Sequence, residues 1–548
     1  MDYLELAELL FPNIKKTSAD YDKMFPKREL PETAEVLRFA PSPTGRLHMG
    51  NLFAAFIPEV FARQSGGVFI LRIEDTDSKR ALENGTVLIL NDLQEYNYKI
   101  DEDPIKGGAY GPYIQSERKE IYLAFAKHLV ASGRAYPCFC QEEQLEDMRK
   151  RQEMKKERIG YYGQYAKCRN LSLDEIKNKL ANQEKFVIRL KSLGNFEKKF
   201  IFKDRIKGSL ELNQNDIDHV LIKSDGIPPY GFAHIVDDYS MGVTTITRDD
   251  WYISSVPFHL EIWDALGLKA PKFAHILPIC VKDEGIVRKL SKRKDPQAAI
   301  SYYHEKGIPK TAIMLYFATI LNSNFEDWYR EYPRSDYHEF NFSFAKMSKS
   351  SPLFDLGKLN NIARNYLSSL SAIAVYQQLL IWAEEFDVEL YQLITKYKDE
   401  TIATLNIERE QAKPRKDYAC YSEIKDSISY MYDELFYQEK NNDLTKKPFY
   451  LKETLEDYLE NIYDEADDKE TWIKKIKEFC PKYSFCPDMK EYREHAENYV
   501  GSLADFCELL RIGATRRTIT PDLYEILRIL GKEKLKKRFD ELCLRNNK

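Results

Sequence analysis

The sequence has no excess of positive charge. Its 548 residues include 82 Lys and Arg against 87 Asp and Glu, which gives a formal net charge of -5. Proteins that bind nucleic acid through their overall charge are usually basic, so any contact with RNA must use local basic patches. The composition, with 31% charged and 43% hydrophobic residues, is otherwise ordinary, and the length exceeds what one hydrophobic core organises.

Long apolar runs and a leader peptide are also missing. The longest apolar run, Ala312–Leu321, is about half the length of a membrane-spanning helix. The first residues, MDYLELAELLFPNIKK, carry acids where a secretory leader has a basic region. The nine cysteines are odd in number and scattered, which is typical of a reducing compartment. We therefore expect a cytoplasmic chain with no membrane partner.

Neither familiar phosphate-binding loop, GxxxxGK(S/T) or GxGxxG, occurs in Val36–Asp77, yet this stretch has the pattern of a βαβ unit. Val36–Ala40 is typical of a short buried strand, and Pro41–Gly45 of a tight loop. Apolar residues then recur at helical spacing from His48 to Gln64, and Val68–Ile73 is a second strand. The two strands should lie parallel.

The start of the predicted helix suits a phosphate group. Helix N-termini present free N–H groups and a partial positive charge. His48 stands at this start, and Gly50 would let a ligand approach the main chain closely. On spacing alone, an ordinary loop with an incidental histidine is an equally good interpretation.

The segment RFAPSPTGRLHMGN resembles the first signature of class I aminoacyl-tRNA synthetases, with His48-Met49-Gly50-Asn51 in place of the HIGH motif. PSPTG and the later RIEDTD are similar to the glutamate branch of that family. Asn51 departs from the second His of the motif, at a position that varies within the branch. The resemblance implies an α/β class I nucleotide-binding fold, Rossmann-like and HUP-type. An α/β insertion splits this fold, and an all-α C-terminal half follows it.

The same resemblance gives a domain plan. It comprises an N-terminal helical extension (1–33), the first catalytic half (34–116), an insertion that binds the tRNA acceptor end (117–228), the second catalytic half (229–282), a lysine loop with a region that contacts the tRNA body (283–345), and a helical anticodon-binding region (346–548).

Two segments compete for the second class I signature, the KMSKS loop, whose lysine neutralises the triphosphate. Lys289–Arg293 reads KLSKR, and Lys346–Ser350 reads KMSKS literally. We choose the first, because it follows the second catalytic half and lies in a strongly basic stretch that suits polyphosphate. The glutamate branch typically has KLSKRK-like sequences here.

The implied activity is attachment of L-glutamate to tRNA(Glu) by way of a glutamyl-adenylate, with ATP and Mg²⁺, by a monomer. The implied catalytic residues are His48, Gly50, Lys289 and Lys292. ATP would contact Pro41, Ser42, His48, Gly50, Asn51, Tyr252, Ser291 and Lys292. Glutamate would contact Arg38, Ser42, Glu74, Tyr230, His234 and Arg248. The tRNA would contact Asp77, Arg80, Arg511 and Arg516.

The pattern also predicts local structure around some of these residues. Asp237 and Asp238 should close a strand, and Arg248 should follow a second one. Arg248 could alternatively pair with a neighbouring aspartate. The basic stretch Arg511–Arg517 should form a Gly-containing loop that contacts RNA, or else a solvated helix end.

Some members of the family carry zinc on a Cys-x-Cys…Cys-x-His set in the insertion. This chain has Cys138, Cys140 and Cys168, but Asn170 replaces the histidine. Structural zinc prefers four N or S ligands, so the sequence does not favour a metal here. A nearby tyrosine oxygen would be an unusual fourth ligand.

Two other functions remain open at this stage. One is glutamylation of a modified tRNA base by a related enzyme, although the roughly 200 helical residues at the C-terminus argue against it. The other is a non-catalytic RNA-binding regulator built on an inactive synthetase. Retention of His48, Gly50 and Lys292 argues against the second.

Overall fold

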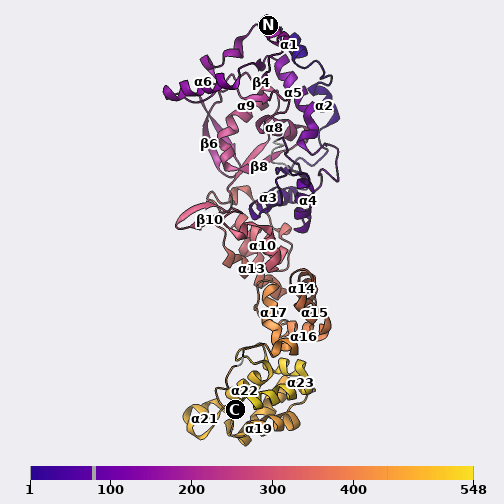
Figure 1. Cartoon of the computed structure of the whole chain (residues 1–548), viewed down its shortest axis with the longest axis vertical. Coiled ribbons are helices and arrows are strands. Elements are labelled where there is room, and N and C mark those ends of the chain that lie inside the picture. Colours follow the sequence, from indigo (N-terminus) through magenta and orange to yellow (C-terminus); the bar gives the residue numbers. More distant parts are fainter. Residues whose placement is uncertain (1, 77–81, 441, 547–548) are drawn as a thin grey trace. The chain divides into compact units, whose positions relative to one another are not determined.

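The computed structural model describes residues 2–76, 82–440 and 442–546 (Figure 1). The chain divides into two compact units. The first comprises Met1–Tyr302 and Met314–Asp355, and the second comprises Tyr303–Ile313 and Leu356–Lys548. Among the described residues, no helix is long and apolar enough to cross a membrane.

The predicted βαβ unit is confirmed. Strand β1 (Val36–Phe39) pairs in parallel with β2 (Val68–Leu71), in a register that sets Val36 opposite Val68. Helix α3 (Met49–Ser65) connects the two strands. It ends at Gly66, whose left-handed conformation (φ 66°) suits glycine. The parallel crossover places the start of α3 beside the carboxyl end of β1, where open α/β folds bind ligands.

The second catalytic half supplies four further elements: α8 (Tyr230–Ser240), β8 (Thr245–Asp249), α9 (Val256–Ala265) and β9 (Lys272–Ile276). Strands β8 and β9 are parallel. Asp237 and Asp238 lie within α8, so the expectation that they close a strand is wrong. Both are fully buried. Arginines from other elements pair with them, which is what allows two carboxylates inside the protein.

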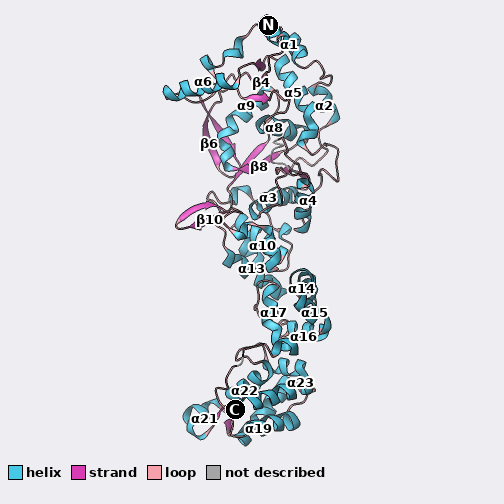
Figure 2. Ribbon diagram, in the orientation of Figure 1, coloured by secondary structure: helices cyan, strands magenta, loops and turns pink. Residues whose placement is uncertain are grey.

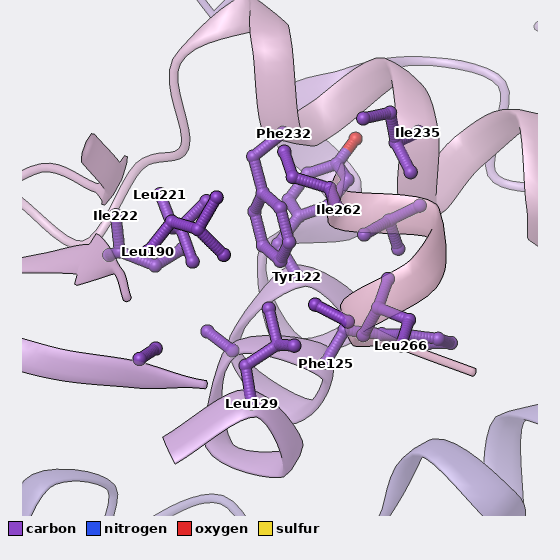
Figure 3. Close-up of a cluster of buried hydrophobic side chains, with 14 of the residues drawn as sticks. Tyr122, Phe125, Leu129, Leu190, Leu221, Ile222, Phe232, Ile235, Ile262 and Leu266 are labelled. Atoms are coloured by element: carbon purple, nitrogen blue, oxygen red, sulfur yellow. The ribbon is translucent and has the colours of Figure 1, made fainter. Parts of the chain in front are cut away.

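The insertion has its own small sheet, in the order β3-β4-β7. Its elements are α5 (Lys119–Ala131), β3 (Ala135–Cys138), α6 (Glu142–Met154), α7 (Leu173–Ala181), β4 (Val187–Leu190) and β7 (Val220–Ile222). Figure 3 shows side chains of α5, such as Tyr122 and Leu129, between this sheet and side chains of α8 and α9. Insertion and catalytic half therefore share one hydrophobic core.

One hairpin of the insertion joins the catalytic sheet. Strands β5 (Lys199–Asp204) and β6 (Gly208–Asn213) are antiparallel, and the four-stranded order is β6-β5-β9-β8. Asp204, the last residue of β5, pairs with Phe273 of β9. This contact brings an acidic residue from the insertion next to the catalytic strands.

The N-terminal extension forms α1 (Tyr3–Leu10) and α2 (Ser18–Met24). Its hydrophobic residues belong to the same core as α5. Arg28 extends this attachment by donating two hydrogen bonds of 2.7 Å to Glu102. The segment is thus a structural part of the first unit.

Remaining elements of the catalytic region are α4 (Gly85–Glu95), the hairpin β10 (Cys280–Asp283) and β11 (Ile286–Lys289), α10 (Ile300–Lys306), α11 (Lys310–Leu321) and α12 (Phe325–Glu331). The KLSKR segment begins in β11 and continues beyond it. The lysine loop is therefore attached to the end of an antiparallel hairpin.

The second unit is helical, as Figure 2 shows, apart from a two-residue pairing of β12 (Phe485–Cys486) with β13 (Gly501–Ser502). Its helices are α13 (Leu356–Ser369), α14 (Ala372–Phe386), α15 (Val388–Lys396), α16 (Lys398–Asn406), α17 (Ser422–Ile428), α18 (Asp433–Phe436), α19 (Leu451–Asp457), α20 (Lys469–Phe479), α21 (Met489–Glu494), α22 (Leu503–Thr515) and α23 (Leu523–Asn546).

The expected loop at Arg511–Arg517 is largely the last turn of α22. Gly513, which suggested a turn, lies where the helix packs closely on α23, because a Cβ there would be 2.8 Å from the Phe539 ring. Glycine serves helix packing here, and the loop prediction is wrong.

Candidate active site

His48 is the N-cap of α3 and does not lie inside the helix. Its Nδ1 accepts a hydrogen bond from the Asn51 main-chain N (3.1 Å), and the Asn51 side-chain oxygen accepts from the His48 N (3.3 Å). This reciprocal cap explains how asparagine serves where the family motif has a second histidine. Because Nδ1 is the acceptor, the proton of the neutral ring lies on Nε2.

The surroundings of His48 disfavour its protonated form. Burial, and then the nearby Lys292 and Lys289, lower the pKa of His48 to about 4. The imidazole is therefore neutral at pH 7 and presents one N–H. Gly50 follows in the first turn of the helix, next to the His48 ring.

The lysine loop lies beside the His48 loop. Lys292 Nζ donates to the main-chain carbonyl of Arg46 at 2.5 Å, and burial lowers the pKa of Lys292. Lys289 Nζ lies 3.3 Å from Asp249 and 4.2 Å from the centre of the Trp251 ring. The Ser291 main-chain N donates to Asp295 (2.8 Å), which shapes the loop. The competing Lys349 is exposed.

The other end of the site contains buried arginines. Arg38 of β1 donates from Nε to Asp238 (2.9 Å) and from Nη1 to the Thr247 carbonyl (2.9 Å). Arg72, directly after β2, donates to the same Asp238 carboxylate (2.7 Å) and to Glu74 (3.0 Å). Sequence reasoning missed Arg72, although an arginine directly after a buried apolar strand was a usable signal. Burial raises the pKa of the Glu74 carboxyl to about 7.

Arg248 lies within β8, is 8% exposed and has histidines as its hydrogen-bonding partners. Its Nε donates to His275 Nε2 (3.0 Å) and its Nη1 to His259 Nδ1 (2.9 Å). Its Nη2 is buried and has no hydrogen-bond partner in the part of the chain that the structure describes. Asp249 and Asp250 are paired with lysines, so the alternative of an ion pair between Arg248 and a neighbouring aspartate is wrong.

Aromatic rings complete this pocket. Tyr230 stacks on His234 with centroids 4.8 Å apart and contacts Tyr252 at 5.3 Å, while Arg248 lies 5.5 Å from the Tyr252 ring centre. His234 Nδ1 is 3.4 Å from Asp238, and burial lowers the pKa of His234 to about 4. Most of the residues assigned to glutamate from the sequence are thus brought together.

The remaining residues assigned from the sequence belong to the loop after β1 or to the sets expected to contact tRNA. The Pro41 carbonyl accepts from the Glu74 N (3.0 Å), which ties the two loops together, and Ser42 is exposed beside it. Asp77 and Arg80 lie outside the described residues. In the second unit, Arg511 donates to Thr520 (3.1 Å).

Arg516 does not suit contact with RNA. The residue is 5% exposed, and its guanidinium lies 2.5 Å from Glu541 and also donates to two main-chain carbonyls. The sequence could not show this burial, because the acceptors are 25 and more residues away.

Three thiols form a cluster in the insertion. The Sγ atoms of Cys138, Cys140 and Cys168 lie within 4.8 Å of one another, and Cys140 and Cys168 are 3.7 Å apart. The hydroxyl of Tyr161 is 3.3 Å from Cys140 Sγ. Tetrahedral zinc at Zn–S distances near 2.3 Å separates two sulfurs by about 3.8 Å. These residues therefore fit a zinc ion, with the Tyr161 hydroxyl close enough to serve as the fourth ligand.

Comparisons with known proteins identify the family of the chain. The model of the family described as tRNA synthetases class I (E and Q), catalytic domain, matches residues 35–361. A glutamate--tRNA ligase of Acetivibrio thermocellus is 45% identical over 547 residues, which cover 99% of this chain and 100% of that protein. One from Clostridium beijerinckii is 43% identical over 549 residues, 99% of each chain.

A solved structure is similar in fold. The crystal structure of a glutamate tRNA ligase from Elizabethkingia meningosepticum in complex with its amino acid has a TM-score of 0.73 to this chain. The match covers 93% of this chain and 99% of that one, at 24% sequence identity.

Proposed function

The chain belongs to the family of class I tRNA synthetases for glutamate and glutamine, and from this membership we propose that it uses ATP to attach glutamate to tRNA. In the first step, a carboxylate oxygen of glutamate attacks the α-phosphorus of ATP. A P–O bond forms, the bond to pyrophosphate breaks, and glutamyl-adenylate results. In the second step, a hydroxyl of the terminal tRNA ribose attacks the activated carbonyl and AMP leaves.

Positioning and charge stabilisation account for the first step, with no covalent intermediate on the protein. The neutral His48 donates a hydrogen bond from its Nε2–H to a phosphate oxygen, beside the free N–H groups at the start of α3. Lys292, which is held next to this loop, neutralises the β- and γ-phosphates. ATP enters as its Mg²⁺ complex, in which the ion contacts phosphate oxygens.

The pocket binds glutamate through its ammonium group and through its side-chain carboxylate. The ammonium group binds Glu74, whose carboxylate Arg72 holds in place. The side-chain carboxylate binds Arg248, and the observation that supports this role is the buried Nη2 that lacks a partner among the described residues. Arg38 is already neutralised by Asp238, so it is the weaker candidate for reading a second carboxylate.

Binding of tRNA is assigned by segment. The insertion, 117–228, binds the acceptor end, and the helical region 346–548 reads the anticodon, with Arg511 as a contact. Arg516 is withdrawn from this set because of its burial. The partner is tRNA(Glu), and the enzyme acts as a cytoplasmic monomer.

Zinc would be held by Cys138, Cys140, Cys168 and Tyr161. It would supply a structural cross-link between β3 and the segment that contains Tyr161, without a part in the chemistry. The sequence does not favour a metal, and the position of Tyr161 is the reason to propose one. Tyr161 lies 21 residues beyond Cys140 in the sequence, so only the fold shows that its hydroxyl is close to the thiols.

An exchange assay tests the function directly. Purified protein is incubated with ATP, labelled pyrophosphate and one amino acid, with and without tRNA. Glutamate should support exchange and glutamine should not, and charging of tRNA(Glu) should follow. Absence of glutamate-dependent exchange under both conditions would identify a non-catalytic regulator, and glutamylation of a base instead of the terminal ribose would identify the modifying enzyme.

A further inference from the structure

The orientation of Arg248 depends on a histidine whose proton position is fixed by its neighbours. A guanidinium can only donate hydrogen bonds, so His275 Nε2, 3.0 Å from Arg248 Nε, must present a lone pair. The proton of the neutral ring is then on Nδ1. This Nδ1 lies 2.7 Å from Asp204 Oδ2, to which it donates. The chain Asp204–His275–Arg248 therefore has one consistent direction of donation.

Asp204 is itself held firmly. Its Oδ1 accepts from the main-chain N of Ile206 (2.9 Å) and Lys207 (2.8 Å), and its Oδ2 also accepts from the His275 N (3.1 Å). Burial alone would raise the pKa of Asp204, but the hydrogen bonds from His275 and the main chain outweigh it and lower the pKa. The carboxylate is thus an ionised acceptor that cannot present a proton to His275.

We propose that Asp204 and His275 are positioning residues that aim Arg248 at the side-chain carboxylate of glutamate, so that Asp204, on the hairpin of the insertion, contributes to amino-acid specificity without touching the substrate. This inference rests on the proposed function of Arg248. It explains why the pocket uses histidine at this arginine. Arg38, by contrast, donates directly to the Asp238 carboxylate, which it shares with Arg72.

An uncharged acceptor has a definite advantage at Arg248. Neutral histidines at Nε and Nη1 fix the guanidinium plane but contribute no negative charge, while Nη2 stays without a partner among the residues the structure describes. A carboxylate ligand then supplies the missing charge and the missing acceptor together. An amide supplies neither in full, because it offers one oxygen and no charge.

Substitution of Asp204 by asparagine tests this chain of hydrogen bonds, called the relay below, with little change in the shape of the side chain. The amide oxygen can satisfy the main-chain N–H groups of Ile206 and Lys207, which leaves the NH₂ group facing His275. To accept from this NH₂ group, the ring must move its proton from Nδ1 to Nε2, and the resulting Nε2–H then faces Arg248, so that two donors meet. In Asp204→Asn we expect the KM for glutamate to rise about 10- to 100-fold, as for a buried donor left without its partner. The KM for ATP should change little, and the preference for glutamate over glutamine should fall.

Variants at His275 give an independent readout. Glutamine can accept from Arg248 through its side-chain oxygen, so His275→Gln should keep most of the preference for glutamate, whereas His275→Leu should lose it. Glu211→Gln is the matched control, since it removes an exposed carboxylate that pairs with Lys199 on the same hairpin. If Asp204→Asn does not fold, as judged by circular dichroism, the two His275 variants carry the test.

Arg248→Gln separates failure of the relay from failure of the proposed function. All variants are assayed by pyrophosphate exchange with glutamate and glutamine. The relay is overturned if Arg248→Gln loses the preference while Asp204→Asn and His275→Leu keep the wild-type ratio. It is also overturned if those two variants slow both amino acids equally and raise the KM for ATP, which a purely structural role would produce. If Arg248→Gln itself keeps the wild-type ratio, the proposed function of Arg248 fails as well.

Discussion

Gly50 lies against the imidazole of His48. A Cβ at position 50 would come within 2.9 Å of His48 Cε1 and 3.1 Å of Nδ1. The sequence pattern alone favours a place where a ligand approaches the main chain closely. The structure gives a nearer reason: any side chain here would displace the ring that caps α3.

Gly50→Ala should therefore reduce activity far more than stability, although loss of the His48 cap costs about 0.5–2 kcal/mol. The added methyl pushes His48 from its cap position, and a shift of about 1 Å in a positioning group can reduce a rate about 10²-fold. Alanine is otherwise the better helix former, by up to about 1 kcal/mol, so Tm should not fall through loss of helix propensity. Pyrophosphate exchange and thermal unfolding measure the two quantities.

Gly66→Ala, at the other end of the same helix, is the matched control. Its φ of 66° strains alanine, but no atom lies within 4 Å of the added Cβ. We expect lower stability with unchanged exchange, the reverse of Gly50→Ala. Full exchange activity in Gly50→Ala would mean that the orientation of His48 is unimportant.

Lys292→Ala should slow adenylate formation strongly. A preorganised cation facing developing charge contributes roughly 3–4 kcal/mol, or about 10²- to 10³-fold in rate. Lys292 lies beside the His48 loop, whereas Lys349 in the literal KMSKS spelling is exposed. Lys349→Ala should be close to wild type in the exchange assay. If it is instead the more damaged variant, the lysine loop has been assigned to the wrong segment.

The kcat/KM for glutamate should depend on pH through Glu74. Its pKa is raised to about 7 by burial, so the carboxyl is largely protonated below that pH and cannot bind the ammonium group as an anion. Because kcat/KM reports the free enzyme, it should rise by up to about tenfold per pH unit below 7 and level off above. Glu74→Gln should be slower and should lose this dependence. A wild-type profile that is flat between about pH 6 and 8 would contradict the role of Glu74.

The raised pKa of Glu74 also makes the stability of the protein depend on pH, and stability should fall as kcat/KM rises. Since the folded protein holds this proton up to about pH 7 and the unfolded chain releases it near the ordinary value of 4.5, the contribution of Glu74 to stability falls as pH rises between these values. Glu74→Gln should remove that part of the pH dependence in thermal unfolding curves.

Elemental analysis should find about one zinc per chain if the cysteine cluster binds the ion as proposed. Tyr161→Phe should weaken retention of the metal during dialysis against a chelator, because it removes the fourth ligand, while Asn170→Ala should not. Equal retention in both variants would exclude Tyr161 as a ligand. Wild-type protein with well under one zinc would restore the expectation drawn from the sequence.

Local features of the site could be predicted from the sequence. The β1–α3–β2 unit and the position of His48 follow from apolar spacing and turn residues within about forty positions. The same reasoning placed Asp237 and Asp238 at a strand end, because an apolar run followed by acids has that appearance. Their partners, Arg38 and Arg118, are 200 and 119 residues away.

Contacts between distant segments account for the other differences. His275 and His259 surround Arg248 from two separate elements, and the spacing of histidines in the sequence gave no sign of this. The burial of Arg516 and the approach of Tyr161 to Cys140 likewise depend on packing between segments. Sequence patterns report periodicity and local turns, whereas tertiary packing decides which side chain satisfies which charge.

The central claim is that Arg248 reads the side-chain carboxylate of glutamate, and steady-state pyrophosphate exchange with glutamate and glutamine tests it. A carboxylate can accept two hydrogen bonds from a guanidinium and neutralise it, whereas an amide leaves a buried cation uncompensated at a cost of roughly 3–5 kcal/mol. Wild type should therefore prefer glutamate by a factor of about 10² to 10³ or more in kcat/KM, and Arg248→Gln should lose most of this preference. An Arg248→Gln enzyme that retains the wild-type ratio would contradict the account and leave Arg38 as the candidate.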